Sequence, residues 1–275
     1  MKKISICIVT YNNENNILNV LECIYKHSKN FELETFVVDS NSSDETVALV
    51  KKNFPQVNLI VLPKNRGFGY GHNQVLNTIN SDFHVILNPD ITFDTNIFDE
   101  LSSYLKNNSD VAMVVPQILN SDGSIQDLPR CAPKFKYLIS GRLERFCRLF
   151  KLWRDEYTCK GKNFDKPTEI DFCSGCFIMI RTDIFKKLNG FDERFFMYFE
   201  DADLTRRAQN YGKTVLNPNF CATHTWERTS SKKFKYLCIH INSMIKYFKK
   251  YLHIIFFYDI IYRQNACEVF SALSS

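Results

Sequence analysis

Polar side chains follow four short apolar segments near the start of this sequence, at the point where each segment ends. They are Thr10, Tyr11 and Asn12 after the first segment, Asp39 after the second, Arg66 and Gly67 after the third, and Asn88 and Asp90 after the fourth. The carboxyl ends of parallel strands share one edge of a sheet, and ligands of open α/β sheets bind at that edge. The four clusters together therefore predict a ligand-binding crevice.

Asp90 is the candidate metal ligand of this crevice. Hard divalent cations prefer oxygen ligands, and Mg²⁺ commonly takes one or two carboxylates together with phosphate oxygens. Asn88 is neutral, so it can add only a carbonyl oxygen or hold a water. A simple turn after the strand explains Asn88-Pro89-Asp90 equally well, because these residue types favour turns.

A second acidic cluster, Glu200-Asp201-Ala202-Asp203, follows the aromatic run 195–199. Carboxylates among aromatic side chains lose hydration, which raises their pKa and suits a general base. We expect Glu200 and Asp201 to precede a helix. Asp203 fits a helix cap, or an ion pair with an arginine one turn later.

Alternating apolar periods predict the elements that must position these residues. Strands are expected at 4–9, 35–38, 57–62, 83–87, 111–115, 177–180 and 214–216, and helices at 14–28, 43–53, 67–80, 94–106, 182–188 and 203–211. This alternation predicts an α/β fold with an open, mainly parallel, doubly wound sheet. Residues 120–168 are expected to form a basic, aromatic excursion with one helix near 135–152. The tail 231–275 is expected to be an amphipathic, basic-aromatic helical segment.

Composition narrows the possible functions. Hydrophobic residues are 45% and charged residues 24% of the 275, which excludes long disorder and a polytopic membrane protein. No glycine-rich fingerprint follows the first strand, so a nicotinamide or flavin site is not expected. Residues 131–275 carry a net charge of +10 against −5 for residues 1–130, which favours an anionic partner for the basic part. Nucleic acid is not expected, since no recognition motif is present.

The ten cysteines and the N-terminus predict the compartment. The cysteines follow no disulfide or zinc-finger spacing, and Cys173 and Cys176 lie in an apolar run that predicts a buried structural pair. The apolar run at residues 4–9 is too short for a signal peptide, and no uncharged stretch is long enough to span a membrane. We therefore expect a cytoplasmic protein with reduced thiols.

Taken together, the motifs resemble those of the family 2 glycosyltransferases with the GT-A fold. The matching segments are VTYN at 9–12, VVDSNSSDET at 37–46, NRGFGYGHN at 65–73, ILNPDITF at 86–93, FCSGCFIMIR at 172–181 and GFDERFFMYFEDADLTRRAQNYG at 190–212. The fourth and sixth segments resemble the bacterial rhamnosyltransferases of O-antigen and cell-wall polysaccharide assembly. The resemblance implies a glycosyltransferase domain over 1–230, with a nucleotide-binding half (1–116) and an acceptor and catalytic half (117–230).

The resemblance also implies a role for each candidate residue. The residues implied to contact the nucleotide are Thr10, Tyr11, Asn12, Asp39, Arg66, Gly67 and Asn73. The donor sugar or the acceptor is expected to contact Asn88, Glu200, Asp203 and Arg130. Asp90 and His224 are expected to bind Mg²⁺ or Mn²⁺, and Asp201 is the expected catalytic base. Asn88 departs from the family, in which an aspartate is common at this position. A structural histidine is the alternative reading of His224.

The resemblance implies an inverting transfer from a nucleotide sugar to a glycan or a polyprenyl-diphosphate-linked acceptor. L-rhamnose from dTDP-rhamnose is the first expectation, and a UDP-hexose, hexosamine or galactofuranose donor is the alternative. A catalytically silent module that binds sugar nucleotides or glycans is the rival from another class. The basic tail predicts a peripheral position on the inner face of the cytoplasmic membrane, and a homodimer contact is the alternative use of the tail.

Overall fold

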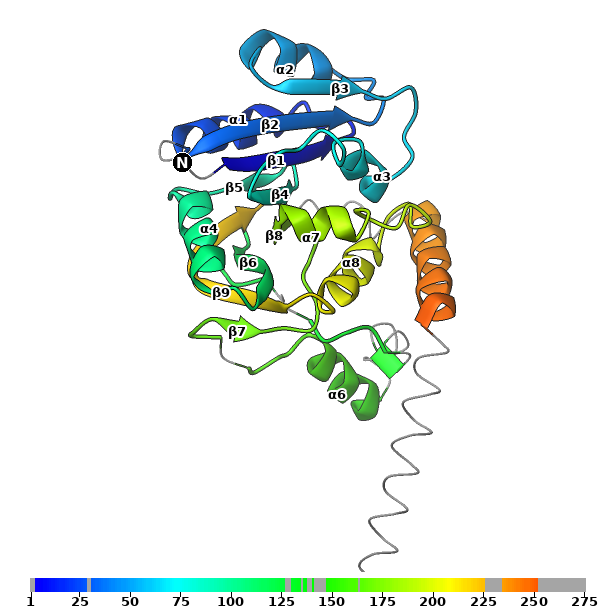
Figure 1. The fold of residues 1–275 in the computed structure, drawn as a ribbon. Helices are drawn as coiled ribbons and strands as arrows, with labels where there is room; N and C mark the ends of the chain where they lie inside the picture. Colours follow the sequence, from blue (N-terminus) through cyan, green and yellow to red (C-terminus); the bar gives the residue numbers. More distant parts are fainter. Residues whose placement is uncertain are drawn as a thin grey trace, which may run out of the picture.

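Parallel strands form the first part of the sheet. They are β1 (Lys3–Thr10), β2 (Glu32–Asp39), β3 (Asn58–Val61) and β4 (Phe83–Leu87), in the spatial order β3-β2-β1-β4. The register pairs Thr10 with Asp39 and Asp39 with Val61, so the carboxyl ends of three strands lie at one level. In the computed structural model these ends point toward the side on which α3 and the C-terminal helix lie (Figure 1).

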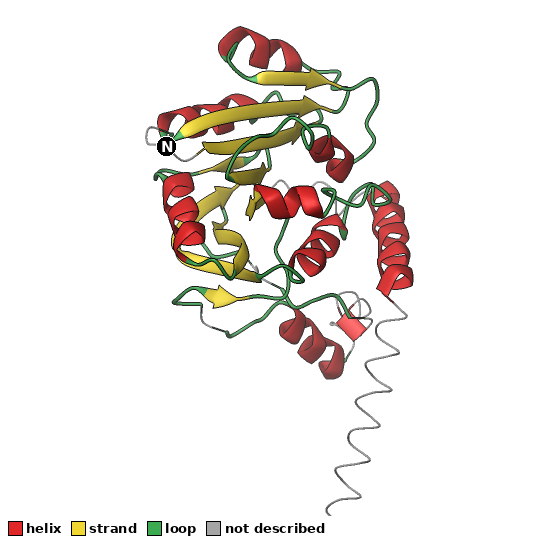
Figure 2. Cartoon of the chain, in the orientation of Figure 1, coloured by secondary structure: helices red, strands yellow, loops and turns green. Residues whose placement is uncertain are grey.

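Antiparallel pairing continues the sheet beyond β4. β8 (Phe177–Arg181) runs antiparallel to both β4 and β6 (Val111–Leu119), and β9 (Lys213–His224) runs parallel to β6. The short strands β5 (Ile91–Thr92) and β7 (Thr168–Glu169) pair antiparallel with β9. The predicted α/β class is confirmed, and the sheet is mixed, with its parallel pairs concentrated in the first part (Figure 2).

Alternate residues of the strands face two separate cores. Ile4, Ile6 and Ile8 belong to one core, together with apolar side chains of the helices α1 (Ile17–Lys26) and α4 (Ile97–Asn107). Cys7 belongs to the other core, which receives Phe185 of α7 (Thr182–Lys187) and Leu204 of α8 (Glu200–Ala208). Helices therefore cover both faces of the sheet, as the alternating pattern predicts. Cys173 and Cys176 are both buried, which confirms that the pair lies in the core.

Three predicted elements have different bounds in the structure. The helix expected at 67–80 is α3 (Phe68–Asn73), and the strand expected at 214–216 continues to His224. α8 begins at Glu200, so Glu200 and Asp201 lie in its first turn and do not precede it. Leu204 is buried in the second core and Ala202 in a separate aromatic cluster, so packing on two sides stabilises the first turn despite its charged residues.

The structure describes residues 3–28, 31–126, 130–134, 136–137, 140, 147–162, 164–225 and 234–251. The basic excursion contains α6 (Arg148–Tyr157), near the C-terminal end of the helix expected at 135–152. Residues 234–251 form one C-terminal helix. The predicted boundary at 230 and the tail beyond 251 lie outside the described residues, so the division into 1–230 and 231–275 stays a prediction. α2 (Thr46–Asn53) lies between β2 and β3 in the chain.

Candidate active site

The first two strand ends are joined by a buried carboxylate. Asp39 is fully buried, and its Oδ1 accepts a hydrogen bond of 2.9 Å from the Thr10 hydroxyl. Its Oδ2 accepts a hydrogen bond of 2.8 Å from the backbone N–H of Ser42. Each carboxylate oxygen can accept two hydrogen bonds, so Oδ2 retains one lone pair for a further donor. The register of β1 and β2 therefore brings Thr10 and Asp39 together, as the sequence predicts.

The loop after β1 is tied to the loop after β2. Asn12 has a left-handed backbone with φ of 56°, and its side-chain oxygen accepts a hydrogen bond from the Ser43 N–H at 2.8 Å. The Asn12 N–H in turn donates to the Ser42 hydroxyl. Tyr11 next to it is 52% exposed, an open aromatic surface on which a nucleobase can stack. Tyr11, Asn12 and Arg66 are the exposed residues of the predicted nucleotide site.

The third strand end meets the aromatic run before α8. The guanidinium of Arg66 lies 3.8 Å above the ring of Tyr70. Gly67 has φ of 103°, and a Cβ atom there would lie 2.2 Å from the Phe196 carbonyl oxygen. The next N–H, of Phe68, donates to the same carbonyl at 3.0 Å. Only glycine allows this close approach, which joins the predicted nucleotide loop to the segment that leads to Asp201.

Asn73 has a structural role in this arrangement. Its amide nitrogen donates to the Phe191 carbonyl and to a Glu193 carboxylate oxygen, and its amide oxygen accepts from the Phe191 N–H at 2.8 Å. Both ends of the side chain are therefore used in holding residues 190–193 against α3. Asn73 thus acts as a clamp within the fold, and its nucleotide contact stays a prediction.

Asp90 and His224 meet at the edge of the sheet. The antiparallel register of β5 and β9 pairs Ile91 with His224, which brings the preceding residue, Asp90, beside the imidazole. His224 Nε2 lies 3.2 Å from Asp90 Oδ2, and both side chains are largely buried. The Asn88 N–H donates to the Cys176 carbonyl at 2.9 Å, which fixes the turn that carries Asp90. His224 lies beside Asp90 because β9 continues beyond the expected end at residue 216.

Asp90 and His224 could supply two of the ligands of a divalent cation. The buried Asp90 Oδ1 accepts no hydrogen bond from the described residues. Neighbouring ligands of an octahedral Mg²⁺, each about 2.0–2.1 Å from the ion, lie ~3 Å apart, close to the observed separation. Among the described residues no third His, Cys, Asp or Glu joins them. The remaining ligands of such an ion would be diphosphate oxygens and water, so the residues present fit a divalent cation.

Asp201 is held by backbone N–H groups at the start of α8. Its Oδ2 accepts from the Gly175 N–H at 3.1 Å and its Oδ1 from the Ala202 N–H at 2.9 Å. The neighbouring Glu200 is buried, and its Oε2 accepts no hydrogen bond from the described residues. Two carboxyl groups thus share the first turn of one helix.

Burial raises the pKa of both carboxyl groups. For Glu200, burial is the larger cause and the charge of Asp201 adds to it. For Asp201, burial raises the pKa, and the N–H groups of Gly175 and Ala202 and the charge of Arg130 oppose the rise. Adjacent carboxyl groups titrate as a pair, with one member staying protonated to higher pH. A raised pKa confirms the electrostatic expectation for this cluster and suits a general base.

Arg130 reaches the same cluster from the basic excursion. Its backbone pairs with Phe172, and its guanidinium lies 5.7 Å from the ring centre of Tyr157. The buried Nε donates to none of the described residues. A nearby cation with an unused donor suits an anionic or hydroxyl-rich ligand.

The segment 172–177 lies between the two carboxylates, Asp90 and Asp201. Burial raises the pKa of Cys176 to about 12, and the charges of Asp90 and Asp201 both add to that rise. The Gly175 N–H donates to Asp201, and the Cys176 carbonyl accepts from the Asn88 N–H, so this segment links the candidate base to the turn that carries the candidate metal ligand.

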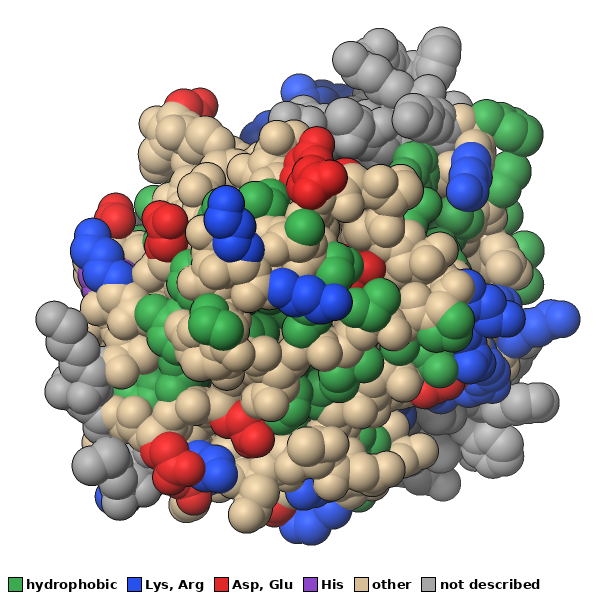
Figure 3. Space-filling model, turned by 90° about the horizontal axis from the view of Figure 1, so that it is seen from above, with side chains coloured by type: hydrophobic (Ala, Val, Ile, Leu, Met, Phe, Trp, Pro, Cys, Tyr) green, Lys and Arg blue, Asp and Glu red, His purple; other side chains and the backbone are tan. Residues whose placement is uncertain are grey.

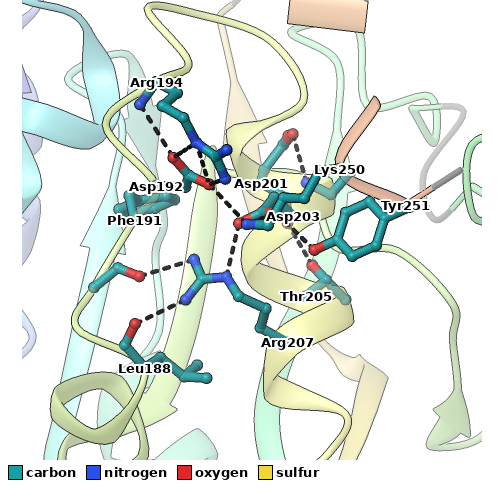
Figure 4. Close-up of polar contacts among 12 residues, drawn as sticks. Leu188, Phe191, Asp192, Arg194, Asp201, Asp203, Thr205, Arg207, Lys250 and Tyr251 are labelled. Carbon is teal, nitrogen blue, oxygen red and sulfur yellow. Dashed lines mark hydrogen bonds and ion pairs between the residues drawn. The ribbon is translucent and has the colours of Figure 1, made fainter. Parts of the chain in front are cut away.

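Asp203 lies among Arg207, Lys250 and Tyr251 (Figure 4). It is fully buried, its Oδ2 accepts from Arg207 Nε at 2.7 Å, and its Oδ1 accepts from the Tyr251 hydroxyl at 2.6 Å. The expected ion pair with an arginine one turn later is present. Both oxygens are engaged within the fold, and the contact of Asp203 with a sugar stays a prediction.

Two residues of the site were missed by the sequence analysis. Gly175 donates its N–H to Asp201, and its position inside the CSGC segment was the available signal. Gln126 holds His224: its Oε1 lies 3.4 Å from His224 Nδ1, and its Nε2 donates to the His224 carbonyl. Nothing in the local sequence marks Gln126, which reaches the site only through the hairpin after β6.

Comparison with known proteins gives the class to which this site belongs. The model of glycosyl transferase family 2 matches residues 5–189, and the model of the N-terminal domain of galactosyltransferase matches residues 155–232. The chain therefore belongs to glycosyl transferase family 2. This confirms the resemblance inferred from the motifs.

Two curated relatives are rhamnosyltransferases. The chain is 25% identical over 193 residues to the N-acetylglucosaminyl-diphospho-decaprenol L-rhamnosyltransferase of Mycobacterium tuberculosis, covering 66% of this chain and 62% of that one. It is 23% identical over 256 residues to rhamnosyltransferase WbbL of Escherichia coli, covering 88% of this chain and 91% of that one. The match thus spans less than two thirds of the mycobacterial relative.

Solved structures share the fold. Staphylococcus aureus TarS 1–349 superposes with a TM-score of 0.57 at 19% identity, over 81% of this chain and 60% of that one. GalNAc-T7, solved with UDP, GalNAc and Mn²⁺, superposes with a TM-score of 0.62 at 13% identity, over 83% of this chain and 44% of that one. The GT-A fold expected from the motifs is confirmed.

Proposed function

We propose that this chain transfers a sugar from a nucleoside diphosphate donor to an acceptor hydroxyl, with inversion at the anomeric carbon. The observation that carries the proposal is Asp201, a carboxylate of raised pKa held by two N–H groups in the same site as the pair of Asp90 and His224. Membership of glycosyl transferase family 2 supports it.

Asp201 is the proposed general base. It takes the proton of the acceptor hydroxyl, whose oxygen attacks the anomeric carbon as the bond to the nucleoside diphosphate breaks on the opposite face. A positioned base typically contributes about 10²–10⁴-fold to the rate. Glu200 stays protonated to higher pH because of its burial and the Asp201 charge, so it is suited to donate a hydrogen bond to a sugar. Arg130 is suited to the acceptor side.

The donor nucleotide is proposed to lie along the ends of β1–β3. Tyr11 offers a surface for the base, and Asp39 retains one acceptor position for a pyrimidine N–H. Asp90 and His224 would hold Mg²⁺ or Mn²⁺, which neutralises charge on the departing diphosphate. Solved relatives of this fold contain Mn²⁺.

We propose dTDP-L-rhamnose as the donor and a polyprenyl-diphosphate-linked saccharide as the acceptor, following the two rhamnosyltransferase relatives. A UDP-sugar is the alternative donor, because TarS has been crystallised with UDP-GlcNAc. The test is a thermal-shift panel of dTDP, UDP, GDP and CDP, each with and without Mn²⁺. Binding to the native state raises stability by RT ln(1 + [L]/Kd).

A metal-dependent shift with dTDP supports the rhamnosyl donor, and a shift with UDP instead overturns that choice. A shift with none of the four nucleotides contradicts the transferase proposal and favours a silent module that recognises glycans. Formation of product from dTDP-L-rhamnose and N-acetylglucosaminyl diphosphoundecaprenol then tests the acceptor.

A peripheral position on the inner face of the cytoplasmic membrane is also proposed. None of the described helices is both long and apolar enough to cross a bilayer. Lys and Arg side chains gather on the side where the C-terminal helix lies in Figure 1 (Figure 3). The residues expected to enter the interface, Phe257, Tyr258, Ile260 and Ile261, lie outside the described residues.

The membrane test is a chain shortened after Tyr251. The longer deletion that begins at residue 232 would also remove the described C-terminal helix. Loss of binding to vesicles that contain phosphatidylglycerol supports an interfacial anchor beyond residue 251. Full binding by the shortened chain contradicts it, and a shortened chain that becomes monomeric while its parent is dimeric supports the homodimer contact.

A further inference from the structure

The C-terminal helix, residues 234–251, lies against the segment that leads to Asp201 (Figures 1 and 4). Two of its lysines donate to that segment. Lys246 Nζ donates to the Arg194 carbonyl at 2.6 Å, and Lys250 Nζ donates to the Asp192 carboxylate at 2.7 Å. Basic side chains that would serve a membrane surface are thus engaged within the protein.

The strongest connection between this helix and α8 runs through Asp203. Its fully buried carboxylate receives Arg207 from α8 and both Lys250 and Tyr251 from the C-terminal helix. Arg207 also donates to the carbonyls of Leu188 and Gly190, each at 2.9 Å. Removing one partner of a buried charged network is costly, because the remaining charge is left without compensation. Asp203 therefore couples the end of the C-terminal helix to the helix that carries Asp201.

The same helix supports a strained turn immediately before Asp201. Tyr198 and Phe199 both have left-handed backbones, with φ of 70° and 68°. A bulky residue in this region is strained, and the conformation persists only where the surroundings hold it. Phe199 is the N-cap of α8, so this turn sets the direction in which Glu200 and Asp201 leave the loop.

Side chains of the C-terminal helix surround that turn. The Ser243 hydroxyl donates to the Met197 carbonyl at 2.7 Å. The ring of His240 lies 5.3 Å from that of Phe199, and the ring of the buried Tyr247 lies 5.4 Å from it on the same helix. The C-terminal helix therefore holds the turn through a hydrogen bond and through aromatic contacts.

We propose that the C-terminal helix is a positioning element of the active site, in which Lys250 and Tyr251 act through Asp203 to hold Asp201 in its working geometry. The inference rests on the proposed function of Asp201 as the base. It gives the described part of the basic tail a role inside the enzyme. Geometry is decisive for such a group, because a misplacement of about 1 Å can cost ~10²-fold in rate.

The test compares Tyr251→Phe and Lys250→Met with Lys249→Met, a change at an exposed neighbour on the same helix. With dTDP-L-rhamnose as donor, we expect kcat to fall about 10-fold in Tyr251→Phe and further in Lys250→Met. KM for the donor stays within about twofold, since the nucleotide end is untouched. Lys250→Arg, which keeps the charge, restores part of kcat.

The pH profile separates positioning from simple loss of folded protein. Loosening the turn admits water to Asp201, which lowers its pKa and moves the acid limb of kcat to lower pH. The titratable groups that face Asp201 are unchanged in these variants; they are Glu200, Arg130, Tyr157, Cys173 and Cys176. An unmoved acid limb with unchanged kcat in folded Tyr251→Phe overturns the proposal.

Hydrogen exchange tests the same contact without any reaction. We expect peptides that cover 195–203 to exchange faster in Tyr251→Phe than in Lys249→Met. Equal exchange in the two variants overturns the inference. If the parent transfers no sugar from dTDP-L-rhamnose and is stabilised by none of the four nucleotides, the proposed function fails instead, and the exchange result still decides whether the helix holds the turn.

Discussion

Asp90 and Asp201 belong to one proposed site, but different features of the fold position them. Asp90 is delivered by regular sheet register, because β5 pairs with β9 and sets it beside His224. Asp201 follows a strained left-handed turn that is held by a helix about 40 residues later in the chain. Asp201 as the proposed base must be oriented toward one acceptor hydroxyl, and a small misplacement of such a group is costly in rate. The difference suggests that support is concentrated where orientation matters.

Asp201→Asn gives the largest expected effect. The amide cannot take a proton, so we expect turnover to fall by about 10²–10⁴-fold while the protein stays folded. The measurement is the initial rate of transfer from dTDP-L-rhamnose. Asp183→Asn, a change in an exposed carboxylate of α7, is the control and should leave the rate unchanged. Equal rates for Asp201→Asn and its parent would remove Asp201 from the mechanism.

Asp90→Asn tests the other carboxylate. We expect the Mn²⁺-dependent part of dTDP binding to weaken at least ~10-fold, or about 1.4 kcal/mol, because the negatively charged cation ligand is lost. Calorimetric titration with and without Mn²⁺ measures it. Asp94→Asn, at an exposed position just beyond β5, should bind like the parent. Unaltered Mn²⁺ dependence in Asp90→Asn would show that the ion sits elsewhere.

Gly67→Ala tests the contact between the nucleotide loop and the catalytic segment. The added Cβ would meet the Phe196 carbonyl at 2.2 Å in a backbone that only glycine adopts easily, so we expect a loss above the ~1–3 kcal/mol of backbone strain alone. Gly123→Ala is the matched control, since Gly123 has φ of 81° and nothing within 4 Å of its Cβ. Urea unfolding compares the free energies of unfolding of the two variants. Equal losses in Gly67→Ala and Gly123→Ala would argue against a close contact between Gly67 and Phe196.

Glu200→Gln gives the smallest expected effect, and it is stabilising. Burial raises the pKa of Glu200 in the folded protein, so ionisation of this carboxyl group lowers the free energy of unfolding. The loss begins above the unfolded pKa of about 4.3 and grows with pH until the folded pKa is passed. The variant should gain about 0.5–2 kcal/mol at neutral pH and nothing near pH 4. Thermal unfolding across pH measures this. A gain that does not change with pH would reject burial of an ionising group as the cause.

The two carboxylates also differ in how far the sequence predicts them. Asp90 follows a short apolar segment that predicts a strand. Strands that alternate with helices pair in parallel, so residues that follow them lie at one edge of the sheet. The partner of Asp90 was harder to place, because β9 continues through a register shift between Pro116 and Gln117 of β6 before it reaches His224. Such an irregularity depends on the neighbouring strand and leaves no periodic signal in the sequence.

Around Asp201 the sequence predicts residue types but not their contacts. The acids among aromatic residues indicate a raised pKa, which the structure confirms. The left-handed conformation of Tyr198 and Phe199 is unfavourable for both residue types, so local propensity argues against it. The role of Asp203 depends on Tyr251, almost 50 positions away, and only tertiary packing reveals it.

The most direct test of the division between the two carboxylates is a single calorimetric experiment. dTDP is titrated with Mn²⁺ into the parent, Asp90→Asn and Asp201→Asn, and transfer from dTDP-L-rhamnose is measured on the same samples. We predict that Asp201→Asn binds dTDP like the parent but transfers almost nothing, whereas Asp90→Asn loses the Mn²⁺-dependent binding. Transfer at the parental rate by Asp201→Asn, or equal loss of dTDP binding in both variants, would contradict the account.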